Sequence, residues 1–316
     1  MFLTIFNSIF PVFIIIILGY WLFKIKFLNV EIQKGLNKLA YWVGLPAFLF
    51  YKVAHAKMNV ETAGNLFICV MVGTGAAMIL GYILARAFKA PRASVGAAIQ
   101  ACGRGNQAFI GLPVIIYTVE QLANQRADLL IDNVVLVLTP TIIIYNLICV
   151  TSLIIHSSKP SENLKKDIFH GLLKNPLIIA CVLGLSWNYF KVDMSADSAL
   201  FRTCGALGKA AFPMALLGIG SQLAQIHLRG HIKLAFVFSL LKTVFAPLVG
   251  YAISRYLGMD NIETLVAMIM LSTPTAVAAY VLADQLECDP DLTASTIMLS
   301  VIFSFFTFSI LLSIFG

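Results

Sequence analysis

Apolar stretches about as long as a bilayer is thick make up most of this chain, with short polar loops between them. Of its 316 residues, 59% are hydrophobic and only 12% are charged, whereas soluble domains carry roughly 25% charged residues. A helix needs roughly 20 mostly apolar residues to cross the hydrocarbon core. Ten such stretches predict an all-α integral membrane protein with ten transmembrane helices. They cover residues 3–23, 36–54, 64–87, 94–117, 128–155, 174–190, 198–224, 232–256, 262–284 and 292–315.

The distribution of Lys and Arg predicts how the chain is oriented. Cytoplasmic loops of membrane proteins carry an excess of these two residues. If the N-terminus faces outside, the basic loops at 24–38, 86–92, 159–174 and 229–233 all lie inside. We therefore expect a multi-pass protein of the inner (plasma) membrane with both termini outside. The net charge of +7 arises in these loops. We therefore predict the lipid bilayer as a partner and no nucleic acid.

Helix-breaking residues interrupt two of the predicted spans near their centres. Residues 101–113 read Ala-Cys-Gly-Arg-Gly-Asn-Gln-Ala-Phe-Ile-Gly-Leu-Pro, and residues 271–280 read Leu-Ser-Thr-Pro-Thr-Ala-Val-Ala-Ala-Tyr. Irregular backbone is tolerated in a membrane only inside protein or beside a water-filled cavity. Two broken spans at corresponding places are typical of a transporter's binding site. Gly111, Pro113 and Pro274 are predicted to keep these helices broken.

The two halves of the chain share a pattern of spacing. Matching Pro, Gly and polar positions are separated by 165 to 169 residues, and the separation drifts slowly along the chain. Each half holds five spans, an odd number, so the second half must be inverted relative to the first. This predicts a first repeat at 1–155, a short cytoplasmic loop at 156–173 and an inverted repeat at 174–316. The matched pairs are Pro11 with Pro176, Pro46 with Pro213, Gly81 with Gly250, and Asn106 with Pro274.

Polar residues at the two breaks are the candidate substrate ligands. Helix N-termini at a crossing of broken helices favour an anion, and the planar guanidinium of Arg104 suits a carboxylate. Alternatively, Arg104 snorkels to the cytoplasmic surface, Asn106 and Gln107 only satisfy the broken backbone, and the threonine hydroxyls only join helices. The predicted substrate-binding residues are Arg104, Gly105, Asn106, Gln107, Thr273, Pro274, Thr275, Tyr145 and Asn146.

Ionisable residues inside spans are candidates for ion coupling, because they are costly to keep in a membrane. Asp132 is the carboxylate placed deepest in a predicted span, and Lys209 and Lys242 are intramembrane cations. Asp132 and Lys209 are the predicted coupling residues, with a proton or sodium as the ion. The alternative for Asp132 is an interfacial position near the outer surface.

The sequence contains no pattern typical of a soluble enzyme, such as a nucleophile elbow, a Walker loop or HExxH, and so predicts no enzyme. The cysteines form no CxxC pair, so no metal and no cofactor are predicted. An enzyme acting on lipids is a rival hypothesis, since the acidic stretch at 284–291 could hold magnesium. A solvated loop is the simpler interpretation of that stretch.

Several short motifs together resemble the auxin efflux carrier family. They are Phe10-Pro11, Leu18-Gly19-Tyr20, Leu36-Asn37-Lys38-Leu39, Leu45-Pro46-Ala47, Gly105-Asn106, Gly111-Leu112-Pro113 and Pro274-Thr275-Ala276. The resemblance implies two inverted five-span repeats, a scaffold built partly from spans 1, 2, 6 and 7, and crossed spans 4 and 9 that contact substrate. The short loop at 156–174 looks like that of bacterial members, which include malate and malonate permeases.

We therefore expect a secondary transporter of a small organic anion that works by alternating access around the crossing of helices 4 and 9. The substrate would be a mono- or dicarboxylate such as malate or malonate, or an auxin-like weak acid. A sodium- or proton-coupled carrier of another small solute and a non-transporting membrane sensor are the alternatives. The sequence leaves open whether the protein forms a homodimer.

Overall fold

The computed structural model describes residues 2–57, 59–157, 174–191, 198–226, 228 and 230–315, so most of the predicted loop at 156–173 lies outside it. All regular elements in these ranges are helical, which confirms the all-α prediction. The α-helices are α1 (Phe2–Lys24), α2 (Val30–Leu39), α3 (Leu45–Ala54), α4 (Val60–Ala87), α5 (Arg92–Gly103), α6 (Leu112–Leu122), α7 (Ala127–His156), α9 (Pro176–Tyr189), α10 (Ala199–Leu223), α11 (Ile232–Leu240), α12 (Ala246–Tyr256), α13 (Asn261–Ser272), α14 (Ala278–Gln285) and α15 (Pro290–Phe315).

Six helical stretches are by themselves long and apolar enough to cross a membrane. The other predicted spans are short or interrupted: 94–117 and 262–284 contain the two breaks, 174–190 corresponds to α9, and 36–54 is divided between α2 and α3. The breaks therefore fall in the spans where the sequence predicts them. The six stretches are Ile5–Lys24, Val60–Ala87, Ala127–His156, Ala199–Leu223, Ile232–Tyr256 and Pro290–Phe315.

In the described residues, three short π-helices each lead directly into an α-helix, and each is followed by a proline. They are η1 (Ala40–Gly44), η2 (Gln107–Gly111) and η4 (Leu241–Phe245). The prolines are Pro46, Pro113 and Pro247, each the second residue of the next helix. Proline donates no hydrogen bond, and its ring clashes with the carbonyl four residues before it. A wider π turn relieves this clash and lets the helix continue.

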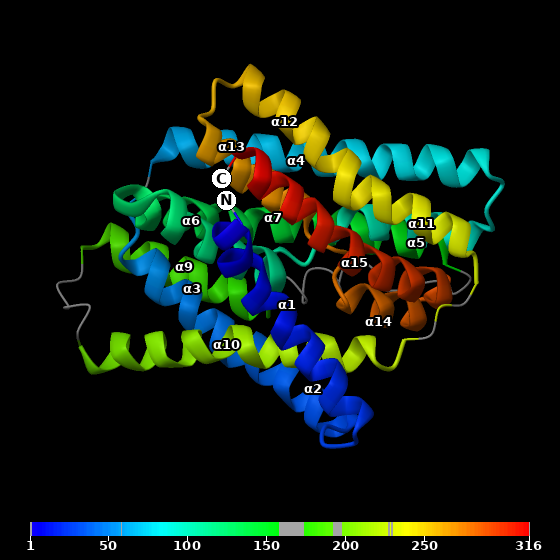
Figure 1. Ribbon diagram of the computed structural model, residues 1–316, viewed down its shortest axis with the longest axis horizontal. Coiled ribbons are helices and arrows are strands. Elements are labelled where there is room, and N and C mark those ends of the chain that lie inside the picture. The colour runs from blue at the N-terminus through cyan, green and yellow to red at the C-terminus, as the bar shows by residue number, and fades with distance from the viewer. Residues whose placement is uncertain are drawn as a thin grey trace.

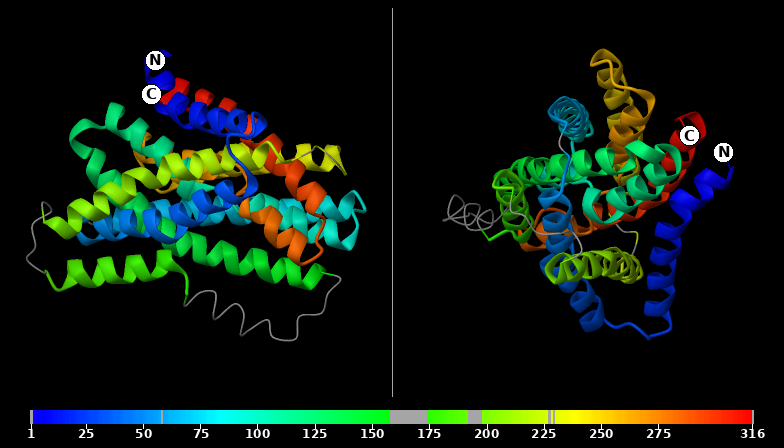
Figure 2. Two further views of the ribbon diagram at one scale, coloured as in Figure 1. Left: turned by 90° about the horizontal axis from the view of Figure 1, so that it is seen from below. Right: turned by 90° about the vertical axis from the view of Figure 1, so that its left-hand side faces the viewer.

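The helices pack as two groups that touch each other. In one group, α10 contacts α1, α2 and α3, and α3 contacts α9. The other group is linked by contacts among α4, α5, α6, α7, α11, α12, α13, α14 and α15. Figure 1 shows α10 and α2 on one side of the molecule and α4 and α12 on the opposite side. We call these the α10 group and the α4 group. The two termini lie side by side where α1 packs on α15 (Figures 1 and 2).

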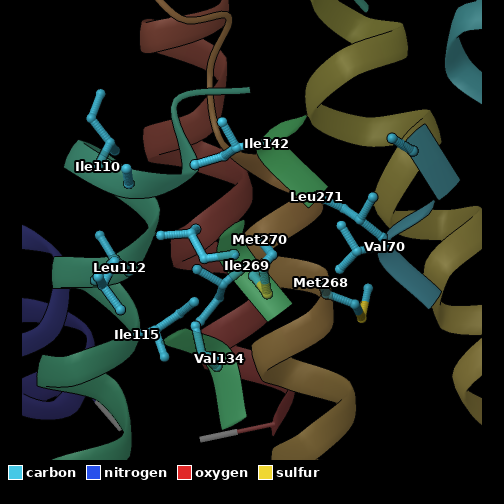
Figure 3. Packing of buried hydrophobic residues seen from close by; sticks show 14 of the residues in the cluster. Val70, Ile110, Leu112, Ile115, Val134, Ile142, Met268, Ile269, Met270 and Leu271 are labelled. Carbon is cyan, nitrogen blue, oxygen red and sulfur yellow. The ribbon is translucent and has the colours of Figure 1, made fainter. Parts of the chain in front are cut away.

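The helix α13 lies in the centre of the α4 group. Its residues 264–272 are all buried, as expected of a helix that is apolar on every face. Figure 3 shows Ile269 near Ile115 of α6, and Leu271 beside Val70 of α4. Because α13 is enclosed on all sides, its C-terminal end at Ser272 lies deep in the protein. The second break begins at that point.

Candidate functional site

The two broken segments lie against each other and run in opposite directions. The backbone N–H of Asn106 donates to the carbonyl of Pro274 at 2.8 Å, and the N–H of Ala276 donates to the carbonyl of Arg104 at 2.7 Å. Between them, Gly105 and Thr275 form an isolated antiparallel β-bridge. These bonds satisfy backbone groups that neither helix can satisfy alone. We call this pairing, residues 104–106 with 274–276, the crossing.

Side chains of each break also bond to the carbonyl end of the opposite helix. Gln107 Nε2 donates to the carbonyl of Met270 at 3.5 Å, and Thr275 Oγ1 donates to that of Ala101 at 2.8 Å. The hydroxyl of Thr273 donates to Met270 as well, at 2.8 Å. The last four carbonyls of a helix lack partners within that helix. Both threonines are fully buried. The hydroxyl of Thr275 joins the second break to the end of α5, whereas that of Thr273 satisfies a carbonyl at the end of its own helix, α13.

Glycine permits the close approach of the two segments. A Cβ added to Gly105 would lie 2.6 Å from Thr273 Oγ1, and one added to Gly111 would lie 2.6 Å from Thr273 Cγ2. Gly111 has ordinary helical dihedral angles (φ −62°, ψ −52°), and Pro113 lies inside α6. The irregular backbone of the first break lies earlier, at 104–106, so close packing is what requires a glycine at 111.

A cavity of about 570 Å³ lies beside the crossing and between the two helix groups. The α10 group contributes residues of α2, η1, α3, α9 and α10, and the α4 group contributes the first break, α7 and α14. Of the predicted ligands, Arg104, Gly105, Asn106, Gln107, Tyr145 and Asn146 line this cavity, whereas Thr273, Pro274 and Thr275 lie behind its wall. Polar lining residues that sequence reasoning missed are Asn37, Lys38, Tyr41 and Gln222.

The exposure of the lining residues locates the mouth and the floor of the cavity. Lys38, Trp42 and Val281 are exposed and mark a mouth between α2 and α14. Tyr145 and Asn106 are buried and belong to the floor. The hydroxyl of Tyr145 donates to the carbonyl of Gly105 at 3.4 Å, so α7 supports the first break from the side.

Unsatisfied polar atoms gather at this cavity. Arg104 Nη1, Gln107 Oε1 and Asn146 Oδ1 are buried and have no hydrogen-bond partner within the described residues. No ion pair in this part of the chain includes Arg104. Arg104 is only partly buried as a residue, but a buried guanidinium nitrogen without an acceptor is costly. The cavity therefore has an unmatched positive charge in its wall.

The two predicted coupling residues lie away from this cavity. Asp132 accepts from the backbone N–H of Lys57 at 3.1 Å and lies 3.8 Å from Lys52 Nζ. It precedes Tyr145 on α7 by 13 residues, which corresponds to about 20 Å along a helix. Lys209 is exposed on the outer surface of α10. Ion coupling through either residue stays a prediction.

Comparison with known proteins identifies the family. The family model described as "membrane transport protein" matches residues 4–312. The chain belongs to this family. The match confirms the resemblance to auxin efflux carriers. The chain is also 25% identical over 302 residues to an uncharacterized transporter of Methanothermobacter thermautotrophicus, with 94% of each chain covered. It is 23% identical over 305 residues to an uncharacterized transporter of Methanocaldococcus jannaschii, with 93% of each covered.

Membership of the membrane transport protein family makes this chain a multi-pass membrane protein that acts on a small molecule. In the described part of this transport protein, no group of three or more His, Cys, Asp or Glu side chains could hold a metal ion. In the acidic stretch at 284–291, the carboxylate of Asp289 accepts from the hydroxyl of Ser94 and from the N–H of Leu292. That carboxylate thus caps α15.

Proposed function

We propose that this membrane transport protein is a secondary transporter of a small organic anion, a mono- or dicarboxylate, which binds in the cavity beside the crossing. The observation that carries the proposal is the buried, unpartnered Nη1 of Arg104 in the cavity wall. A carboxylate would supply the missing charge and accept two parallel hydrogen bonds from the guanidinium. The side-chain oxygens of Asn146 and Gln107 also lack partners. Because an amide oxygen only accepts hydrogen bonds, they would orient the substrate through a hydroxyl or another donor group on it.

The helix ends at the cavity also favour an anion. Residues 106–109, at the start of the continuous helix Gln107–Leu122, line the cavity, and so do residues 276–278 at the start of α14. Both are N-terminal ends, which carry partial positive charge and free N–H groups. Two such ends and Arg104 together favour a negatively charged substrate over a neutral one.

Alternating access follows from the position of the cavity between the α10 group and the α4 group. A rocking or sliding movement of one group against the other would close the present mouth and open a path on the opposite side. This assignment treats residues 1–155 and 174–316 as inverted repeats joined by the loop 156–173. The antiparallel pairing at the crossing supports it, since inverted helices meet in that way. Spans 1, 2, 6 and 7 supply the α10 group.

The mouth of the cavity lies near α2 and α14, beside the loops that the Lys and Arg distribution predicts to be cytoplasmic. We infer that the structure is open to the cytoplasm, with both termini outside an inner (plasma) membrane. On the other side, Lys52 of α3 and Asp128 of α7 form an ion pair at 3.1 Å. This contact joins the two groups at the end opposite the mouth.

The proposal is tested by flux and by solid-supported-membrane electrophysiology on purified protein in liposomes, with a panel of mono- and dicarboxylates. We expect flux of at least one carboxylate class, lost in Arg104→Gln and kept in Arg255→Gln, which removes an exposed arginine at the end of α12. Flux that survives Arg104→Gln unchanged would remove Arg104 from the site. Absence of flux with every acid, with folded protein, would favour another solute or a sensor.

A further inference from the structure

Lys242 is a buried cation that the proposed mechanism does not use. It lies in η4, and its side chain is 1% exposed. Its Nζ donates to the carbonyl of Leu271, in the last turn of α13, at 2.6 Å. No ion pair within the described residues includes Lys242. Because a lone buried charge is costly in a membrane protein, the carbonyl groups around its Nζ must stabilise it.

The Lys242 ammonium lies beside both broken helices. It bonds to Leu271 just before the second break. A Cβ added to Gly105 in the first break would lie 3.1 Å from its Nζ and 2.6 Å from Thr273 Oγ1. The ammonium, the Thr273 hydroxyl and the Gly105 backbone therefore meet at one point of the crossing. Gly105 also lines the cavity, so Lys242 lies directly behind the wall that the substrate would touch.

The crossing has one side that favours cations and another that favours anions. The helices α5 and α13 end there, at Gly103 and Ser272, and the carbonyls at helix C-termini carry partial negative charge. The carbonyl of Leu271 at the end of α13 accepts from Lys242. The N-terminal ends of the Gln107–Leu122 helix and of α14 face the cavity instead. Carbonyl and hydroxyl oxygens at a pair of helix C-termini are the ligands that a sodium ion would use in a broken-helix transporter.

We propose that the Lys242 ammonium is a built-in cation that occupies the position between the Leu271 carbonyl, the Thr273 hydroxyl and Gly105, so that the transporter works without sodium. An ammonium offers three N–H donors to the same oxygens that a sodium ion would contact. A sodium ion added beside it would meet a like charge at short range in a poorly screened interior. The proposed carrier would then bind its anion against positive charge supplied by the protein itself, with Arg104 on the cavity side and Lys242 behind it.

Part of this inference rests on the proposed transport function, and the first test is chosen to be independent of it. The melting temperature of the purified protein is measured in NaCl, KCl and choline chloride at equal ionic strength. We expect the wild type to show no sodium-specific shift. Lys242→Ala removes the ammonium and leaves the Leu271 carbonyl without its donor. The melting temperature of this variant should therefore be a few degrees higher in NaCl than in KCl or choline chloride. Lys233→Ala, at an exposed lysine of α11, should gain none.

A sodium-specific stabilisation of the wild type would overturn the proposal, and so would a Lys242→Ala variant that folds but ignores sodium. The wild-type measurement needs no variant, so misfolding of Lys242→Ala leaves the proposal testable.

In the second test, carboxylate flux of the wild type should be equal in sodium and choline buffers. Lys242→Met should lower that flux about tenfold or more, since a lost hydrogen bond to a charged donor has effects of that order. Unchanged flux in Lys242→Met would count against the proposal. Absence of flux in the wild type would instead contradict the transport function.

Discussion

Arg104 is the residue whose charge decides which substrates the cavity can accept. The guanidinium presents a planar fork to a carboxylate, whereas an ammonium acts as a point charge. We therefore expect Arg104→Lys to keep the preference for anions and to weaken binding by about tenfold, since charge-assisted hydrogen bonds contribute about 1.5–3 kcal/mol each. The concentration dependence of carboxylate flux measures this. Equal apparent affinities for Arg104→Lys and Arg104→Gln would show that charge at this position is irrelevant.

Gly111 packs closely against the second break. Because its Cβ would lie 2.6 Å from Thr273 Cγ2, Gly111→Ala must displace the second break. We expect a loss of about 1–3 kcal/mol in stability, as for other overpacked sites, seen as a lower melting temperature in detergent. Gly75→Ala in α4 is the matched control, since nothing lies within 4 Å of its added Cβ. A drop of equal size in both variants would contradict the packing argument.

At the scale of elements, a small ion-pair network ties the start of α13 to its neighbours. The guanidinium of Arg126 lies 2.8 Å from Asp260 and 3.5 Å from Glu263, and Glu263 also accepts from the hydroxyl of Thr62 at 3.1 Å. Asp260 and Glu263 form a capping box at the N-terminus of α13. Partial burial raises the pKa of Asp260, but the N–H groups of Glu263 and Ile262 together with Arg126 outweigh it and hold this pKa below its usual value.

This depressed pKa predicts how the stability of the cap depends on pH. A carboxyl whose folded-state pKa is lowered stabilises the protein above its ordinary pKa of 3.8, and loses this contribution as the pH falls through the folded value. Asp260→Asn keeps a good N-cap but cannot ionise. We expect the wild type to melt slightly above this variant at pH 6 and the difference to shrink as the pH falls below 3.8. Because the pair is partly exposed, the difference should be below about 1 kcal/mol. A difference that is independent of pH would contradict this account.

At the scale of the whole molecule, the position of the mouth between α2 and α14 makes a prediction about sidedness. Five native cysteines are buried and Cys204 is partly so, so a Cys204→Ser protein should react little with maleimides. In that background, Asn37→Cys at the cavity wall should be labelled by a membrane-impermeant maleimide from the predicted cytoplasmic face. Substrate should slow the labelling. Labelling only from the outer face would reverse the proposed orientation.

Several features of the protein follow from local sequence patterns. The length of the apolar stretches predicts membrane helices because the bilayer core has a fixed thickness. The Gly, Pro and polar residues at 101–113 and 271–280 predict the two breaks because they cannot continue an apolar helix in lipid. Arg104 could be selected as a candidate ligand because a buried guanidinium is rare and costly. These conclusions need only neighbouring residues and the properties of lipid.

Other features depend on which distant residues meet, and only the tertiary structure decided them. For Thr273 and Thr275 the sequence offered two roles, substrate ligand or helix contact, and only the structure shows which carbonyls their hydroxyls meet. Asn37 and Gln222 lie far apart in the sequence, and the packing of α2 on α10 brings both to the cavity. Lys242 meets Leu271 only because η4 packs beside the end of α13. A sequence pattern shows where a helix must break, but the partner of each freed backbone or charged group depends on contacts between residues far apart in the chain.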